Sequence, residues 1–314
     1  MFCLQTGVAG GCRFAEAWLV NRYPWTWKIG GPHKHESCGN PRIIGILNVT
    51  GDSFYDGGRY LSRDPALEQA RRMFELGAEI IDVGGESTRP GAEPVQADLE
   101  IARVVPVIRG LAARLPGALI SVDTYKASVA RAAVDAGAHL VNDVSAGLLD
   151  EKMLDTVAGL GAGYVIMHMR GKPRTMQQDT HYENLTGEIY DFFAARLERA
   201  AASGIDTERI ALDPGIGFGK SAGDNYRLIA GLGEFFSLGR PLVVGPSRKS
   251  FMALAGQPDP EDRLEGTLAA CTVATLAGAD YLRVHDAGPV SRAVAVAGQF
   301  LARGVRAGIP GGKP

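Results

Sequence analysis

The sequence predicts a single α/β domain, a (β/α)8 TIM barrel with a short irregular N-terminal extension. From residue 41 onward, eight short apolar segments alternate with eight segments of helical period. Such a barrel typically needs about 250 residues, which matches the span 41–305. A doubly wound open sheet is the main alternative, but the glycine-rich GxGxxG turn expected after its first strand is missing.

The expected strands are short and almost continuously apolar. This pattern is typical of strands that are buried on both faces of a parallel sheet. In chain order they are 43–49, 79–84, 119–123, 139–144, 164–169, 210–213, 241–245 and 281–285.

The expected helices lie between these strands. Asp64 is a good N-cap residue and Pro65 suits the first helical position. A helix, a Gly-Ala pair and a strand follow one another in ELGAEIID, DAGAHLVND, GLGAGYVIM and LAGADYLRV, where glycine can form a left-handed C-cap. This recurrence indicates one repeated supersecondary unit. The expected helices are 66–76, 96–115, 126–136, 151–160, 183–203, 224–232, 263–277 and 289–303.

Composition excludes several function classes. The chain has 33 Lys and Arg against 35 Asp and Glu, and 46% of its residues are hydrophobic. These values are close to the average for a globular protein, and the near-zero net charge argues against a dedicated binder of nucleic acid or membrane surfaces. No segment has the ~20 apolar residues that a membrane helix needs, and the first residues make a poor signal peptide.

The four cysteines, at positions 3, 12, 38 and 271, have neither metal-site nor CxxC spacing. We therefore expect free thiols and a cytoplasmic protein. His33, His35 and Cys38 lie close together in the sequence, but a structural zinc site needs four ligands. A polar surface loop is the preferred interpretation of this segment.

Residues 1–40 differ from the rest of the chain. They contain all three tryptophans and two Gly-Gly pairs, without a clear period. We expect an irregular extension with one short helix near 13–20, followed by the barrel at 41–305 and a flexible tail at 306–314.

Polar residues follow every expected strand. In a (β/α)8 barrel the carboxyl ends of the strands converge on the active site, so these side chains should meet there. Carboxylates and amides come mainly from the second, third, fourth and sixth strands, and cations from the seventh and eighth. The site should therefore bind a polar or partly cationic group on one side and a phosphate-like anion on the other. The residues are Asn48, Asp82, Asp123, Asn142, His168, Asp213, Lys249, Arg283 and His285.

Two further features of this end of the barrel concern metal binding and access. Asn48 offers a neutral oxygen ligand, which suits Mg²⁺ bound together with a substrate phosphate. The glycine-rich loops after the first two strands have few apolar anchors and are expected to act as mobile lids.

The sequence resembles the dihydropteroate synthase family over roughly residues 41–303. The resemblance lies in the segments IIGILNVTGDSFYDGG, EIIDVGGESTRPGA, SVDTYKASVARAAVDAGAHLVNDVSAG, VIMHMRGKPRTMQ, LDPGIGFGKS, VVGPSRKSF and LRVHD. It implies a pterin-binding barrel that condenses 6-hydroxymethyl-7,8-dihydropterin pyrophosphate with 4-aminobenzoate. The products are 7,8-dihydropteroate and pyrophosphate, in folate synthesis. The resemblance also implies Mg²⁺ as cofactor and a homodimer. The helix at 263–277 could pack against a copy of itself or only against its own barrel.

The resemblance also implies a dissociative reaction and roles for individual residues. The implied catalytic residues are Asp123, Lys249, Arg283 and His285. The pterin site comprises Asp123, Asn142, Met167, Asp213, Phe218 and Lys249. The pyrophosphate site comprises Asn48, Arg89, Arg283 and His285, with Asn48 also holding the metal. The 4-aminobenzoate site comprises Phe54, Thr88, Pro90 and Ser247. Asp52 and Asp82 are expected to be supporting acids.

One departure and two alternatives remain open. Gly51 stands where the family usually has proline, which should make the first loop more mobile. A methyltetrahydrofolate-type pterin methyltransferase would share the pterin site but would not need ESTRPG, SRKS and RVHD. An inactive pterin-binding barrel would have lost competent residues, yet every matched position retains one.

Overall fold

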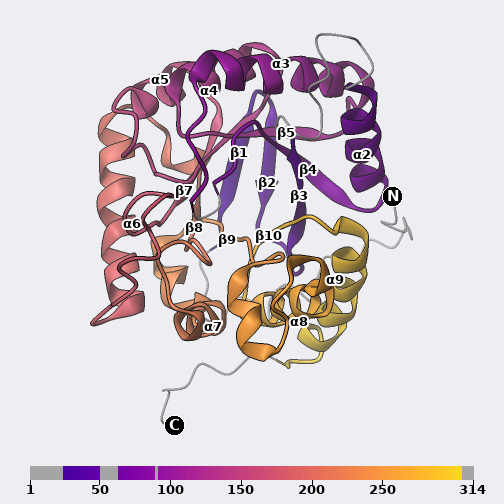
Figure 1. Cartoon of the computed structure of the whole chain (residues 1–314), viewed down its shortest axis with the longest axis vertical. Helices are drawn as coiled ribbons and strands as arrows, with labels where there is room; N and C mark the ends of the chain where they lie inside the picture. The colour runs from indigo at the N-terminus through magenta and orange to yellow at the C-terminus, as the bar shows by residue number, and fades with distance from the viewer. Residues whose placement is uncertain (1–23, 50–62, 89–90, 306–314) are drawn as a thin grey trace.

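The computed structural model describes residues 24–49, 63–88 and 91–305. Within these ranges a ring of helices surrounds a central set of parallel strands (Figure 1). None of the described helices is long and apolar enough to span a membrane.

The central sheet of the described chain has eight parallel strands in the order β8-β7-β6-β5-β4-β3-β10-β9. A parallel bridge between Leu212 and Leu242 joins the two ends of this order and closes the barrel. All eight predicted strands are confirmed, although the seventh is only two residues long. The strands are β3 (Arg42–Asn48), β4 (Ala78–Gly84), β5 (Leu119–Asp123), β6 (Leu140–Asp143), β7 (Gly163–Met167), β8 (Ile210–Asp213), β9 (Val243–Val244) and β10 (Tyr281–Val284).

The eight predicted helices are also confirmed. The first begins at Arg63, so Asp64 lies inside the helix instead of capping it, a difference within the usual uncertainty of helix ends. The four junction glycines have φ between 61° and 115°, as the C-cap prediction requires. The α-helices are α2 (Arg63–Glu75), α3 (Ala97–Arg114), α4 (Ala127–Asp135), α5 (Met153–Leu160), α6 (Leu185–Ala202), α7 (Ala222–Ala230), α8 (Leu264–Leu276) and α9 (Ala287–Leu301). Short 3₁₀ helices are η3 (Thr207–Arg209), η4 (Leu232–Leu238), η5 (Ser250–Ala255) and η6 (Pro260–Asp262).

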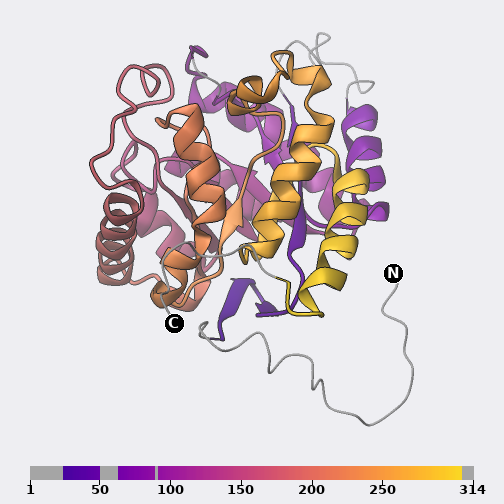
Figure 2. The same ribbon diagram turned by 90° about the horizontal axis from the view of Figure 1, so that it is seen from below.

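The prediction of an irregular segment before residue 41 is wrong for its described part. β1 (Thr26–Gly30) and β2 (His33–Glu36) form an antiparallel hairpin, which lies beneath the amino ends of the barrel strands (Figure 2). β2 reads HKHE and is polar throughout, so it lacks the alternation that identifies a half-buried strand. The helix predicted near 13–20 and the tail predicted at 306–314 lie outside the described residues.

The hairpin closes one end of the barrel with tryptophan. Trp27 is fully buried, and its indole Nε1 donates to the carbonyl of Arg209 at 2.9 Å. The Trp25 indole donates to Asp280 Oδ1 at 3.2 Å. These side chains and Ile29 form one apolar cluster with inward-facing barrel residues such as Tyr281. A second, larger cluster fills the space between the strands and the helices.

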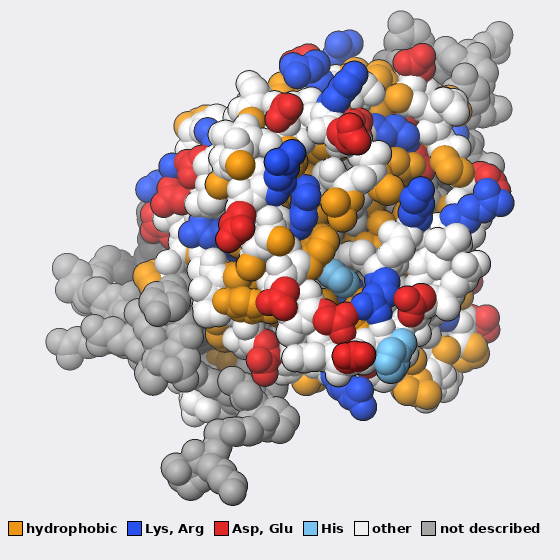
Figure 3. All heavy atoms as spheres, turned by 90° about the vertical axis from the view of Figure 1, so that its left-hand side faces the viewer, with side chains coloured by type: hydrophobic (Ala, Val, Ile, Leu, Met, Phe, Trp, Pro, Cys, Tyr) orange, Lys and Arg blue, Asp and Glu red, His pale blue; other side chains and the backbone are white. Residues whose placement is uncertain are grey.

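The outer surface carries charges of both signs. On the side of the molecule where α6 lies, basic and acidic side chains are interspersed (Figure 3).

Candidate active site

The sheet register brings the predicted site residues to one level of the barrel. Asn48 lies opposite Gly84, and Gly84 lies opposite Asp123 on the next strand. Asp123 in turn lies opposite Asn142, and Met167 lies opposite Asp213. Because all eight strands are parallel, these side chains share the carboxyl end of the barrel, as the sequence predicted.

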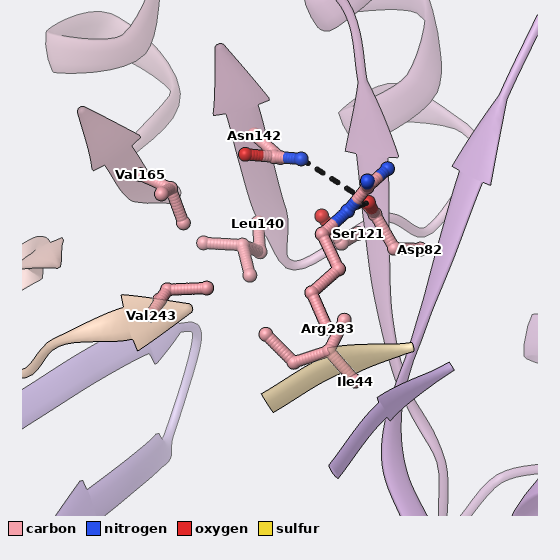
Figure 4. Close-up of a pocket in the computed structure, with 8 residues that line it drawn as sticks. All are labelled: Ile44, Asp82, Ser121, Leu140, Asn142, Val165, Val243 and Arg283. Atoms are coloured by element: carbon pink, nitrogen blue, oxygen red, sulfur yellow. Dashed lines mark hydrogen bonds and ion pairs between the residues drawn. The ribbon is translucent and has the colours of Figure 1, made fainter. Parts of the chain in front are cut away.

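A partly buried guanidinium lies at this end of the barrel. Arg283 Nε donates to Asp82 Oδ2 at 2.6 Å, and Nη2 donates to Asp123 Oδ2 at 2.5 Å. Asn142 Nδ2 also donates to Asp82 Oδ2, at 3.1 Å. Figure 4 shows Arg283 and Asn142 directed at Asp82. Two acidic side chains thus share one cation, and these three residues form the acidic centre.

Burial makes Asp123 unusually basic for a carboxyl group. The side chain is 8% exposed, and desolvation raises its pKa to about 7, against the attraction of Arg283 and with further repulsion from Asp82. A carboxyl group near neutral pKa in a cleft is a typical property of a functional residue.

Three oxygen atoms around this centre are buried and have no hydrogen-bond partner within the described residues. They are Asp82 Oδ1, Asp123 Oδ1 and Ser121 Oγ. Buried polar atoms without partners are costly and rare in folded proteins. Their concentration at the carboxyl end of β4 and β5 fits acceptors that are kept for the N–H groups of a ligand.

Lys249 and Asp213 are two further charged side chains at this end of the barrel, and their charges act on each other. Lys249 donates to the carbonyl of Ile216, and its Nζ lies 4.2 Å from the centre of the Phe218 ring. Burial lowers the pKa of Lys249 to about 8, although the charge of Asp213 opposes this. Burial raises the pKa of Asp213, whose Oδ1 accepts from the Gly215 N–H at 2.7 Å.

An apolar cluster lies next to Lys249. Met167 and Phe218, both predicted to pack on the substrates, belong to one buried cluster with Val144 and Met176. Such a surface suits the flat faces of aromatic rings.

Ser247 is bonded to a residue from the other predicted subsite. Its Oγ lies 3.0 Å from His285 Nδ1 and accepts from the His285 backbone N–H at 3.2 Å. Ser247 Oγ donates to Nδ1 in one tautomer of the imidazole and accepts from it in the other. Beside them, Arg248 donates two hydrogen bonds to Asp286 and links the loop after β9 to the end of β10.

Asn48 lies beside the acidic centre. A Cβ atom built on Gly84 would lie 3.6 Å from Asn48 Oδ1 and 3.8 Å from Asp123 Oδ2, so both side chains flank this glycine. No group of three or more His, Cys, Asp or Glu side chains in the described part of the chain could hold a metal ion. The donor set still fits Mg²⁺, which often takes one or two protein oxygens and completes its shell with phosphate and water.

Several predicted site residues lie at the edge of the described segments or outside them. Thr88 is half-buried at the end of a described segment. Gly51, Asp52 and Phe54 lie outside the described residues, as do Arg89 and Pro90.

One strand-end residue points elsewhere, and one partner was missed by the sequence analysis. His168 does not join the acidic centre, because its Nδ1 lies 2.9 Å from Lys220 Nζ and its ring packs edge-on against Phe192. Lys220 had no predicted role, and the only available signal was a lysine among the apolar and glycine residues of GIGFGK.

Comparison with known proteins agrees with this geometry. Residues 44–285 match the family model described as pterin binding enzyme. The chain is 48% identical over 245 residues to a dihydropteroate synthase of Synechocystis sp., covering 78% of this chain and 84% of that protein. It is 44% identical over 247 residues to a dihydropteroate synthase of Escherichia coli, covering 79% and 87%.

The chain belongs to the dihydropteroate synthase family.

Solved structures of the family have the same fold. The Yersinia pestis dihydropteroate synthase with a sulfonamide drug complex gives a TM-score of 0.81 at 40% identity, covering 87% of this chain and 98% of that one. The Xanthomonas albilineans dihydropteroate synthase with 7,8-dihydropteroate gives 0.75 at 39% identity, covering 85% and 96%. The predicted barrel, the predicted family and the prediction of a transferase of folate synthesis are confirmed. The methyltransferase alternative is set aside, because the relatives are synthases.

Proposed function

We propose that this chain joins 6-hydroxymethyl-7,8-dihydropterin pyrophosphate to 4-aminobenzoate, with the pterin held at the acidic centre of the barrel. The observation that carries the proposal is the pair of carboxylates on Arg283, with three buried oxygens that have no hydrogen-bond partner among the described residues. A pterin presents several N–H donors on one edge, and these acceptors match them. Asn142 and Asp213 extend the same polar surface, and Lys249 supplies a donor.

In the proposed reaction the bond between the pterin methylene carbon and the pyrophosphate oxygen breaks, and its electron pair leaves with pyrophosphate. The amine nitrogen of 4-aminobenzoate then bonds to the methylene and releases a proton to solvent. Positive charge develops on the pterin, where the carboxylate of Asp123 stabilises it. Negative charge develops on pyrophosphate, where His285, Arg283 and Arg89 provide donors. Mg²⁺ held through Asn48 would add positive charge at the same place.

Arg283 connects the two halves of this reaction. Its guanidinium bonds to Asp82 and Asp123, yet the resemblance assigns it to pyrophosphate. One cation between the acidic centre and the leaving group would respond to both developing charges. This position fits electrostatic stabilisation by a preorganised group, which needs no large movement during the reaction.

Met167 and Phe218 belong to the proposed pterin site, and the second substrate is proposed to lie against the same apolar cluster. Phe218 and Met167 offer a flat apolar surface, with Lys249 beside it. A solved Xanthomonas albilineans relative contains 4-aminobenzoic acid. Thr88 and Ser247, together with Phe54 and Pro90, are proposed to complete this subsite.

We further propose a cytoplasmic homodimer that uses Mg²⁺. Val273 on α8 and Val296 and Phe300 on α9 are exposed, and the last two are more than half exposed. Apolar side chains on adjacent helices support a protein–protein contact. The two described cysteines are free thiols, which agrees with a reducing compartment.

The test is an assay of the purified chain with both substrates and Mg²⁺ that follows pyrophosphate and dihydropteroate together. We expect equal rates of the two products and loss of both with EDTA. Tight dihydropterin binding without product would contradict the catalytic proposal and support an inactive pterin-binding barrel. Full activity in EDTA would remove the metal from the proposal.

A further inference from the structure

Lys220, which the sequence analysis did not single out, is among the most buried charged side chains described. It is 2% exposed, and its Nζ lies among four acceptors. These are His168 Nδ1 at 2.9 Å, the carbonyl of Gly215 at 3.0 Å, the carbonyl of Phe218 at 3.1 Å and the carbonyl of His168 at 3.4 Å. Burial lowers the pKa of Lys220 well below its ordinary value. A buried amino group is tolerated when its N–H donors have acceptors, which this arrangement provides.

These contacts tie together two segments from different strands. Gly215 and Phe218 belong to the loop after β8, and His168 follows β7 directly. Burial and the neighbouring cations lower the pKa of His168 to about 2, so its ring stays neutral. Nδ1 can therefore accept a hydrogen bond from Lys220 Nζ. The Nζ group of Lys220 thus holds the loop after β8 against the end of β7.

The backbone of the loop after β8 passes very close to its neighbours. A Cβ on Gly215 would lie 1.9 Å from the carbonyl oxygen of His168, and a Cβ on Gly217 would lie 2.8 Å from Lys249 Cδ. The backbone therefore passes against both neighbours at distances that only glycine permits. Asn225 accepts from the Gly217 N–H, and Gln177 and Tyr182 donate to the carbonyls of Gly217 and Gly219. Lys220 holds two other carbonyls of the loop, those of Gly215 and Phe218.

The same loop presents the groups that contact Lys249. Its Ile216 carbonyl accepts from Lys249 Nζ, and the ring of Phe218 lies against that ammonium. The charge of Asp213, at the start of the loop, acts on both lysines and opposes the lowering of their pKa values. A shift of the loop would therefore displace a donor, an aromatic face and a carboxylate together.

We propose that Lys220 is a positioning residue for the pterin pocket, which sets the places of Phe218 and Lys249 through the loop carbonyls and His168. It does not touch substrate in this arrangement. This inference rests on the proposed function, because Phe218 and Lys249 matter only if they line the substrate pocket.

The experiment compares Lys220→Met with two variants of His168, the side chain that accepts from Lys220. His168→Asn keeps an acceptor near the Nδ1 position, whereas His168→Leu removes it. Misplacement of binding groups by about 1 Å can cost about 100-fold in rate, so we expect kcat/KM for the pterin pyrophosphate to fall by roughly that factor in Lys220→Met. The loss should lie mainly in KM and should appear in the dissociation constant of 7,8-dihydropterin. His168→Leu should follow Lys220→Met, and His168→Asn should stay close to wild type.

A control variant separates positioning from loss of stability. Trp27→Phe at the opposite end of the barrel should lower the unfolding temperature without changing the KM for either substrate. Equal kinetic constants in folded Lys220→Met and wild type would overturn the inference, as would equal behaviour of His168→Asn and His168→Leu. If Lys220→Met does not fold, the difference in kcat/KM between His168→Asn and His168→Leu tests the inference. Failure of the proposed function is distinguishable, because wild type would then form no product and Lys249→Met would bind dihydropterin as wild type does.

Discussion

The two ends of the barrel are built from the same strands but have opposite chemistry. At the amino end, Trp25, Trp27 and Ile29 cover the opening with apolar surface, and both indole N–H groups have partners. At the carboxyl end, Asp82 and Asp123 are buried around one guanidinium and retain oxygens that have no hydrogen-bond partner among the described residues. The first arrangement stabilises the fold, whereas the second reduces stability and prepares a polar pocket. Mutations at the two ends should therefore separate stability from activity.

The largest effect is expected at the amino end. Trp27→Ala removes a fully buried indole and should lower the free energy of unfolding by about 3–5 kcal/mol, as for other large-to-small core substitutions. Denaturant unfolding measures this change. Below the unfolding transition, kcat and the KM values for both substrates should remain at wild-type levels. A large fall in kcat would show that the two ends are coupled.

The next effect belongs to the carboxyl end. Asp123→Asn removes the carboxylate proposed to stabilise the pterin cation and should lower kcat by about 100-fold or more. The dissociation constant of dihydropterin should change less, because an amide retains an acceptor. The unfolding temperature should stay the same or rise, since a desolvated charge is lost while Arg283 keeps Asp82. Equal losses in turnover and binding would contradict this role.

The pH profile of kcat/KM should reflect the ionisation of Asp123 and Lys249. The pKa of Asp123 is raised to about 7 and that of Lys249 is lowered to about 8. The ionised pair therefore predominates between about pH 7 and 8, where kcat/KM should be greatest. The acid limb of the profile should disappear in Asp123→Asn.

The contributions of Asp123 and Lys249 to the free energy of unfolding change with pH in opposite directions. Asp123, with a raised pKa, contributes stability that is fully present below the ordinary carboxyl pKa of 3.8 and is lost as pH rises through about 7. Lys249, with a lowered pKa, contributes stability that is present above 10.5 and is lost as pH falls through about 8. In Asp123→Asn the unfolding temperature should vary less between pH 4 and 7 than in wild type. An unchanged slope would assign the titration to another group.

The smallest effect should come from Ser247→Ala. Loss of one neutral hydrogen bond to His285 should cost about 1 kcal/mol, or roughly a fivefold fall in kcat/KM for the pterin pyrophosphate. The Michaelis constant for 4-aminobenzoate should also rise, because Ser247 is proposed to line the subsite of that substrate. An unchanged constant would contradict this placement and show that the hydroxyl acts only through His285.

The sequence alone determined the barrel and most of its site. Strands buried on both faces are apolar throughout, and their helices follow at short intervals, so the eight units were visible without contacts. Parallel strands place their carboxyl ends together, so Asp123, Asn142 and Asp213 could be assigned to one region from their positions alone.

The tertiary structure decided what spacing cannot encode. The hairpin at Thr26–Gly30 and His33–Glu36 exists because Trp25 and Trp27 bury themselves against barrel residues more than a hundred positions away. The pairing of Arg283 with Asp82 and Asp123, and of Lys220 with His168, joins residues from different strands and depends on the closed barrel. Local pattern reports burial and period, whereas the partner of a charge and the pKa that results depend on long-range geometry.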